Sequence, residues 1–347
     1  MKKRMEWLDI AKGMAILLVV IGHVSMIPWN PWRKIIFSVH MPLFFIAAGV
    51  TAKGMALSKE YFVKIFKRLM IPYIITALIG VAILAVKMKG NISILTEIER
   101  MLWASGVPAD YGPGVPITGE SSIPVIGAIW FLPCIFWAKL LFEIVLKCTE
   151  KSEEWLRGIV VLVFTIVGYG VGQKVKVPIG IDISVFVMIF LYSGYLMKKY
   201  DVLNKKYQMI AVVAMALWFL ALRVNAIELS ARFYRPFPNC IFSILGAIGG
   251  SYIVFIVSYE VIEKTKVCKN LLIFCGQHSL LMLCIHHLEG NAINWEKIVT
   301  LMFDSGNLFY NGIVIAILRI VFILTVSFII VMMKKRGKTF NDKTKTK

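Results

Sequence analysis

Apolar runs of about twenty residues recur along the whole chain, and they restrict the possible folds more than any other feature. A helix needs about 20 apolar residues to cross the hydrocarbon core of a bilayer. Hydrophobic residues make up 59% of the 347 residues, charged residues only 17%, and mean hydropathy is +0.76. These values lie outside the range of ordinary soluble domains. We therefore predict an all-α, polytopic membrane helix bundle.

Ten segments are apolar enough and long enough to be membrane spans. We expect them at residues 10–29, 35–52, 69–86, 124–146, 158–173, 179–197, 208–223, 239–262, 271–288 and 313–333. No internal repeat of the kind found in inverted-repeat transporters is evident. The longest outer connection, residues 87–123, is too short and too rich in Gly and Pro to form a domain of its own.

The distribution of Lys and Arg favours one orientation of these spans. With the N-terminus inside, the inner segments carry 25 of the 39 Lys and Arg residues and the outer segments 11; only Lys12, Lys139 and Arg319 lie within spans. Both termini are therefore expected in the cytoplasm, with residues 334–347 as a basic tail. The net charge of +19 is divided among short clusters between apolar runs. It indicates an anionic membrane surface as the partner, and no nucleic acid.

The first span carries three ionisable residues, Asp9, Lys12 and His23. Eleven residues separate Lys12 from His23, about three helical turns, so both side chains are expected on the same side of a helix, about 16 Å apart along its axis. Asp9 can pair with Lys12 at i,i+3 spacing. Lys12 could instead extend to the headgroups with Asp9 neutralising it, and His23 could bond a neighbouring helix. Because ionisable side chains within spans are uncommon and often functional, all three are catalytic candidates.

The first span, WLDIAKGMAILLVVIGHV (7–24), resembles that of acyltransferase family 3, integral-membrane enzymes that modify surface glycans. A basic residue, ten intervening residues and a histidine characterise that family, here Lys12 to His23. The sequence is more specifically similar to the branch that includes fucose 4-O-acetylases. Further stretches agree in order: HMPLFFIAAG (40–49), KIFKRLMIPY (64–73), IWFLPCIFW (129–137), IGIDISVFVMIFLYSGYLMKK (179–199) and CGQHSLLMLCIHH (275–287). Lys12 departs from the Arg of the wider family and lacks its planar guanidinium.

The resemblance implies an acyltransferase domain over residues 1–333. The expected reaction transfers an acetyl group from acetyl-CoA, or another short acyl-CoA, to a hydroxyl of a cell-surface carbohydrate or lipid-linked glycan. His23 would act as general base, because an imidazole titrates near neutral pH; an acyl-histidine intermediate is a variant. Asp9 would fix Lys12, and Lys12 would help to bind the donor. No permanently bound cofactor is implied, and the expected location is the cytoplasmic membrane of a bacterium.

Other polar residues occupy positions from which they could serve the same reaction. His40 opens the expected second span and is a further catalytic candidate, or else an interfacial histidine. His286 ends the ninth span and is expected to face the interior, while His287 points about 100° away. We assign His286, Asp182 and Trp130 to acceptor binding. Asp182 could instead mark a helix start, and Trp130 could belong to an aromatic belt.

Charged and polar loops suggest where the two substrates bind. Lys64, Lys67 and Arg68 share one face of a short inner helix, which suits an anionic donor such as coenzyme A. Positive-inside topology also explains these charges. The outer segments 87–123 and 223–238 are assigned to the acceptor on position alone.

Metal chemistry and transport are the alternatives to this hypothesis. Three histidines, His23, His40 and His286, could in principle bind zinc, but no close-spaced pair anchors such a site, so we expect no metal. The six cysteines form no C-x-x-C pair and are expected to be small buried apolar residues. A transporter or flippase of a lipid-linked glycan is the second hypothesis; the missing repeat symmetry and paired half-helices disfavour it.

Overall fold

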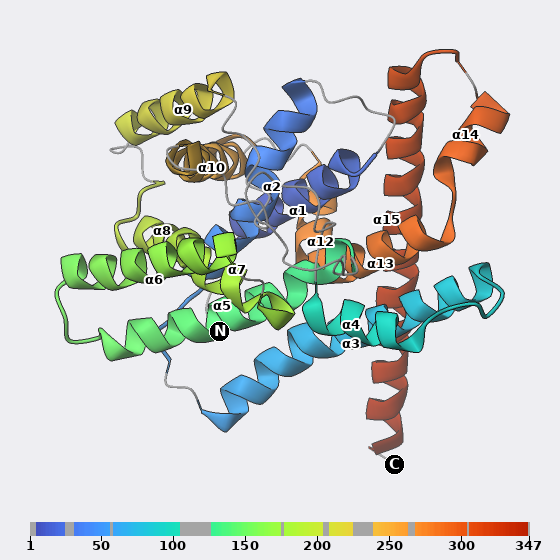
Figure 1. Cartoon of the computed structure of the whole chain (residues 1–347), viewed down its shortest axis with the longest axis horizontal. Coiled ribbons are helices and arrows are strands. Elements are labelled where there is room, and N and C mark those ends of the chain that lie inside the picture. The colour runs from blue at the N-terminus through green and yellow to red at the C-terminus, as the bar shows by residue number, and fades with distance from the viewer. Residues whose placement is uncertain are drawn as a thin grey trace.

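The computed structural model is helical wherever it describes regular structure (Figure 1). It describes residues 5–24, 31–55, 58–104, 126–174, 177–203, 208–224, 239–262, 268–303 and 305–345. Over these ranges there is no β-strand, which agrees with the all-α prediction.

Six helices within these ranges contain a stretch long and apolar enough to cross a membrane. They are α2 (Pro31–Val50), α3 (Lys59–Lys87), α5 (Phe131–Cys148, extended by the 3-10 turn η1, Ala128–Trp130), α6 (Glu154–Lys174), α10 (Asn239–Ile256) and α15 (Leu308–Lys345). Two bent pairs would raise the number to eight: α7 (Ile181–Phe186) with α8 (Met188–Lys199), and α12 (Lys269–Gln277) with α13 (Ser279–Ala292). The protein is therefore a polytopic helical membrane protein.

The number of ten spans and the cytoplasmic termini stay predictions. Two of the ten expected spans correspond to shorter helices, α1 (Glu6–Gly22) with 17 residues and α9 (Gln208–Arg223) with 16. The basic segment that follows residue 333 continues α15 as a helix to Lys345.

The apolar runs predict continuous helices for the sixth and ninth spans, and the structure corrects both. α7 and α8 meet at Val187 with a bend of 49°, after the 3-10 turn η2 (Pro178–Gly180), while α12 and α13 meet at His278 with a bend of 77°. An apolar run cannot reveal such a break when the residues on both sides of it are equally apolar. The second bend matters for function because it sets the direction of the helix that carries His286.

Two short amphipathic helices, α4 (Ile94–Trp103) and α14 (Trp295–Phe303), lie where we expected loops. A search for runs of twenty apolar residues misses such helices, since their apolar residues recur with the helical period instead. α4 buries Glu97 and exposes Ile94, Leu95 and Ile98. The remaining regular element is a π-helical segment, η4 (Val257–Ile262), directly after α10.

Glycines allow the backbones of α1 and α12 to approach closely. A Cβ atom at Gly13 would lie 2.1 Å from the carbonyl oxygen of Leu272, and one at Gly276 would lie 1.8 Å from that of Asp9. No larger residue fits at either position, and small residues at helix contacts are typical of membrane bundles. This contact fixes the N-terminal half of α1 against α12.

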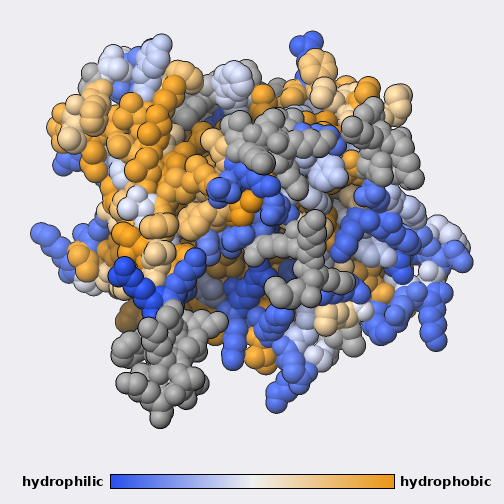
Figure 2. Space-filling model, turned by 180° about the vertical axis from the view of Figure 1, so that it is seen from behind, coloured by the Kyte–Doolittle hydropathy of each residue, from blue (hydrophilic) through white to orange (hydrophobic). Residues whose placement is uncertain are grey.

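The outer surface of the bundle is apolar over a broad area. Figure 2 shows hydrophobic side chains gathered at the upper left of the reversed view, the side on which α15 lies. α15 exposes Ile317, Val321, Phe328 and Ile329. Large exposed apolar areas are unusual on soluble proteins and normal where a helix faces lipid.

Candidate active site

A cavity of about 690 Å³ opens beside the C-terminal end of α1. Its walls come from α1, the second half of α3, α4, the start of η1, α13, α14 and α15. The lining side chains that carry acid–base or hydrogen-bonding chemistry include His23, His286, His287, Trp295 and Arg319. This volume is typical of a small-molecule site.

His23 lies at the end of α1 and is exposed. The first span was expected to continue through it to residue 29, but α1 ends at Gly22 and His23 is its C-cap residue. The Nδ1 atom of His23 lies 2.7 Å from the carbonyl oxygen of Val19. Because a carbonyl only accepts hydrogen bonds, the hydrogen is on Nδ1 and the Nε2 atom keeps its lone pair. His23 therefore offers the cavity an imidazole nitrogen that can accept a proton.

Lys12 and Asp9 form the ion pair that their spacing predicts, with 2.7 Å between Lys12 Nζ and Asp9 Oδ1. Asp9 is buried, and the Lys12 side chain is partly exposed. Neither Asp9 nor Lys12 is among the described residues that line the cavity. The ion pair and His23 therefore do not share one cavity wall, although they belong to the same helix.

A charged cluster that the sequence did not predict lies beside His286. Arg319 on α15 donates two hydrogen bonds to Glu289 Oε1, from Nη2 at 2.6 Å and from Nε at 2.9 Å. The indole Nε1 of Trp295 donates to the other carboxylate oxygen. His286 Nδ1 lies 3.2 Å from both Glu289 Oε1 and Arg319 Nη2. His286, Glu289 and Arg319 are all buried. We call these three residues and Trp295 the Arg319 cluster.

The Arg319 cluster is connected directly to His23. Arg319 Nη1 donates to the backbone carbonyl oxygen of His23 at 3.0 Å, which satisfies one of the carbonyls that a helix end leaves unpaired. The rings of His23 and His286 lie 5.3 Å apart between centroids. Two imidazoles from distant parts of the chain thus meet at one corner of the cavity.

Weak signals for this cluster are present in the sequence. Glu289 stands three residues after His286, so both lie on one face of a helix. Arg319 is one of three cationic residues within the expected spans, and such residues usually have a buried partner. Neither signal indicates that α13 and α15 meet, which is the step that only the structure supplies.

The two neighbouring histidines of α13 both reach the cavity. His287 was expected to point away from the interior, but it is half-buried and lines the cavity with His286. Its Nε2 atom lies 3.1 Å from Asn291 Nδ2. An amide nitrogen only donates, so this contact occupies the lone pair of His287 Nε2.

Three further candidates do not line the cavity: His40, Asp182 and Trp130. His40 does not open its helix, because α2 begins at Pro31, a residue suited to a first helical turn. It is buried in the middle of α2, with its ring centroid 6.3 Å from that of His23, and its Nδ1 donates to Ile36 O at 2.9 Å. Asp182 is buried in the first turn of α7, and Trp130 is half-buried in η1.

The expected donor-binding cations are exposed on the first half of α3. Lys64, Lys67 and Arg68 lie on this half, whereas residues from Ala77 to Lys87 of the same helix line the cavity. Arg68 and Gly80 are separated by about 18 Å along the helix axis. α3 therefore connects a basic surface to the cavity.

The assigned outer segments are only partly described. Residues 105–123 of the first and 225–238 of the second lie outside the described residues. In the described part, Lys87, Glu97 and Arg100 line the cavity, and Arg100 Nη1 lies 2.9 Å from Glu97 Oε2.

No cysteine occurs among the described residues that line the cavity. All six cysteines are free; Cys134, Cys240, Cys275 and Cys284 are buried, as expected, but Cys148 and Cys268 are exposed. Over the ranges that the structure describes, no group of three or more His, Cys, Asp or Glu residues is arranged to hold a metal ion.

Comparison with known proteins identifies the class of chemistry. The model of acyltransferase family 3, described as an acyltransferase domain, matches residues 5–332, nearly the whole chain. No curated protein matches the chain significantly.

Proposed function

Because the chain belongs to acyltransferase family 3, we propose that this membrane-embedded acyltransferase transfers an acetyl group from acetyl-CoA to a hydroxyl of a cell-surface carbohydrate. The observation that carries the proposal is the exposed His23 imidazole, whose Nε2 lone pair is available in a cavity of about 690 Å³. Such a nitrogen can remove the proton of a hydroxyl group at neutral pH.

The cavity suits an acceptor rich in hydroxyl groups. Its lining includes Asn291, Asn294, Glu296 and Trp295, which combine hydrogen-bonding groups with an aromatic surface. Hydrogen-bonding side chains that converge on one cavity are typical of sites that orient a small molecule. The similarity to fucose 4-O-acetylases supports a sugar as the acceptor.

The reaction needs one base and no metal. His23 Nε2 takes the proton of the acceptor hydroxyl while the oxygen attacks the thioester carbonyl carbon. The new C–O bond forms, the C–S bond breaks, and coenzyme A leaves as a thiolate that regains the proton from the imidazolium. A positioned general base contributes roughly 10²- to 10⁴-fold to the rate of such a step.

The donor is proposed to approach from the end of the bundle where Lys64, Lys67 and Arg68 are exposed. Cationic side chains there can bind the phosphates of acetyl-CoA. Lys12, held by Asp9, adds a further cation on the neighbouring α1. The flexible arm of coenzyme A would span the distance along α3 to His23. The Lys and Arg distribution supports cytoplasmic termini, and the proposed location is the cytoplasmic membrane of a bacterium.

Purified protein with acetyl-CoA labelled in the acetyl group tests the proposal. We expect thiol release and transfer of label to the deacetylated surface glycan of the producing cells, whose mass rises by one acetyl unit per modified hydroxyl. His23→Ala should abolish both while the protein still inserts and purifies normally. His278→Gln, which keeps a hydrogen-bonding side chain at a position outside the cavity lining, is the matched histidine control. Full activity of His23→Ala would remove His23 from the mechanism, and a wild-type protein that releases no thiol would favour the flippase hypothesis.

A further inference from the structure

We propose that Glu289 and Arg319 are positioning residues that hold His286 as a second imidazole for the acceptor beside His23. This inference rests on the proposed function. It assigns His286 to a neighbouring hydroxyl of the acceptor, and it predicts that the enzyme prefers acceptors with two adjacent hydroxyl groups.

The Glu289 carboxylate is held by hydrogen bonds to both of its oxygens. Oε1 accepts from Arg319 Nη2 and Nε, and Oε2 accepts from Trp295 Nε1. These donors come from α15 and α14, whereas Glu289 belongs to α13. A carboxylate held by two separate helices has one orientation, and the Glu289 side chain is 1% exposed.

The Glu289 carboxylate in turn determines the orientation and tautomer of His286. Its Nδ1 lies 3.2 Å from Glu289 Oε1. An ionised carboxylate is a strong acceptor for an imidazole N–H, and it fixes both the ring orientation and the tautomer. We therefore assign the hydrogen to Nδ1, which leaves a lone pair on Nε2. Arg319 Nη2, also 3.2 Å from Nδ1, can only donate, and one of its two N–H groups donates to Glu289 Oε1 at 2.6 Å. Of the two equally long contacts of Nδ1, we assign the hydrogen to the one with the carboxylate, because a charged acceptor makes the stronger hydrogen bond.

Arg319 joins the two histidines. Its Nη1 atom donates to the carbonyl oxygen of His23, while Nη2 and Nε hold Glu289. One planar guanidinium thus fixes the end of α1 and the carboxylate behind His286. A lysine ammonium could not make these three contacts in fixed directions.

The two imidazoles consequently have the same arrangement. Nδ1 of His23 faces the carbonyl oxygen of Val19, and Nδ1 of His286 faces the carboxylate of Glu289. In both rings Nε2 keeps a lone pair that can bind a molecule in the cavity. One lone pair can remove the proton of the reacting hydroxyl, and the other can accept a hydrogen bond from the hydroxyl next to it. His287 does not offer this, since Asn291 occupies its Nε2.

Steady-state kinetics with both substrates separates positioning from mere stability. The probe acceptor is the deacetylated surface glycan of the producing cells, and the donor is acetyl-CoA. Glu289→Gln should raise the KM for the glycan or lower kcat, together a loss of about 10- to 100-fold in kcat/KM for the glycan. The KM for acetyl-CoA should change much less. Arg319→Lys, which keeps the charge, should lose less than Arg319→Ala.

A double variant tests whether Glu289 acts through His286. If it does, Glu289→Gln combined with His286→Asn should be no slower than His286→Asn alone, because residues that act as a unit are not additive. Multiplied losses in the double variant would overturn the proposal. If Glu289→Gln fails to fold, Trp295→Phe removes one donor to the same carboxylate and serves in its place.

The control is Glu154→Gln. Like Glu289, Glu154 is paired with a buried Arg, here Arg157, which follows it at i,i+3 spacing. Glu154→Gln should lower the thermal midpoint of unfolding. It should not raise the KM for the glycan relative to the KM for acetyl-CoA. The same pattern in Glu289→Gln would show a purely structural role and overturn the inference while leaving the proposed function intact. A wild-type protein without acetyl transfer would instead overturn the proposed function itself.

Discussion

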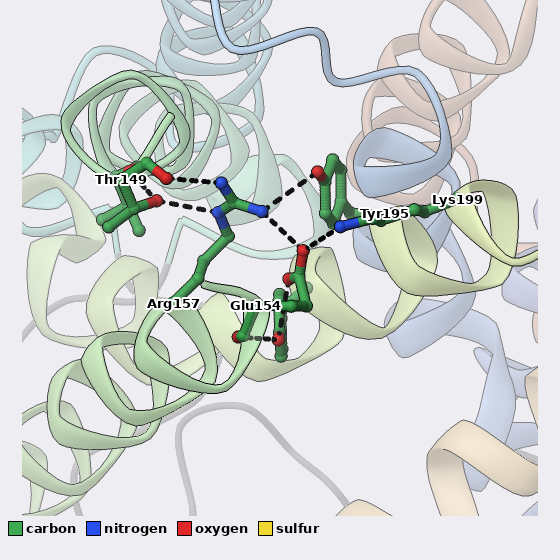
Figure 3. Close-up of polar contacts among 7 residues, drawn as sticks. Thr149, Glu154, Arg157, Tyr195 and Lys199 are labelled. Atoms are coloured by element: carbon green, nitrogen blue, oxygen red, sulfur yellow. Dashed lines mark hydrogen bonds and ion pairs between the residues drawn. The ribbon is translucent and has the colours of Figure 1, made fainter. Parts of the chain in front are cut away.

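Two buried arginines, Arg157 and Arg319, have similar partners and differ in what else they contact. Figure 3 shows Arg157 among Thr149, Glu154 and Tyr195. Its Nη1 donates to Glu154 Oε2 at 2.6 Å and to Tyr195 Oη at 3.2 Å. Its Nε and Nη2 donate to the hydroxyl and carbonyl oxygens of Thr149, at 2.8 and 2.5 Å. We call these residues, with Lys199 bound to Glu154, the Arg157 cluster.

The Arg157 cluster connects the α5–α6 turn to α8, and none of its residues lines the described cavity. The Arg319 cluster connects α13, α14 and α15 to the end of α1, and three of its four residues line the cavity. A buried ion pair by itself is weak evidence for either stability or function. What distinguishes the Arg319 cluster is that its hydrogen bonds reach the side chain of one cavity-lining histidine, His286, and the backbone carbonyl of another, His23.

The largest expected difference between the clusters follows removal of each arginine. Arg319→Ala should lower acetyl transfer by about 100-fold, because it frees both the end of α1 and the carboxylate behind His286. Arg157→Ala should leave kcat/KM per folded molecule unchanged and lower stability instead. Breaking a buried ion pair costs about 3–5 kcal/mol in soluble proteins. Activity and thermal midpoint, both measured on the same detergent-solubilised sample, check the pair of expectations.

An intermediate effect is expected when one neutral partner of each arginine is changed. His286→Asn should lower kcat/KM for the glycan by about tenfold or more, with little change for acetyl-CoA. Thr149→Val removes the oxygen that accepts from Arg157 Nε, and leaving a buried donor unpaired costs about 1–3 kcal/mol. Thr149→Val should therefore denature at lower temperature with unchanged kinetics. Altered glycan kinetics in Thr149→Val would remove the distinction between the two clusters.

The fold class could be predicted from the sequence because burial in lipid demands long apolar runs. The run of residues 271–288 located α12 and α13 but concealed the bend of 77° at His278. The helical period of ILTEIERMLW was present in the sequence, yet a window of twenty residues averages such a short amphipathic helix away. Length and composition specify spans, whereas bends and interfacial helices depend on packing between segments.

The candidate site divides in the same way. His23 could be found from the sequence, since an ionisable residue within an apolar run is unusual. The pairing of Asp9 with Lys12 could be found too, because both lie within one helical turn. Glu289 and Arg319 could not be connected, since 30 residues separate them and their contact depends on how α13 meets α15. Local spacing predicts contacts within a helix, and tertiary packing decides the rest.

The smallest expected effects come from removing a single hydrogen-bonding group while an aromatic ring stays at that position. Tyr195→Phe loses the hydroxyl that accepts from Arg157 Nη1, and Trp295→Phe loses the indole N–H that donates to Glu289. A hydrogen bond contributes about 1 kcal/mol net, which corresponds to a factor of about five in a rate or binding constant. Trp295→Phe should therefore lower kcat/KM for the glycan by about fivefold, whereas Tyr195→Phe should shift only the thermal midpoint. The effect of Trp295→Phe is measured by varying the glycan concentration at saturating acetyl-CoA. If Trp295→Phe and Tyr195→Phe had the same kcat/KM for the glycan, the contact from α14 would not be needed for Glu289 to orient His286.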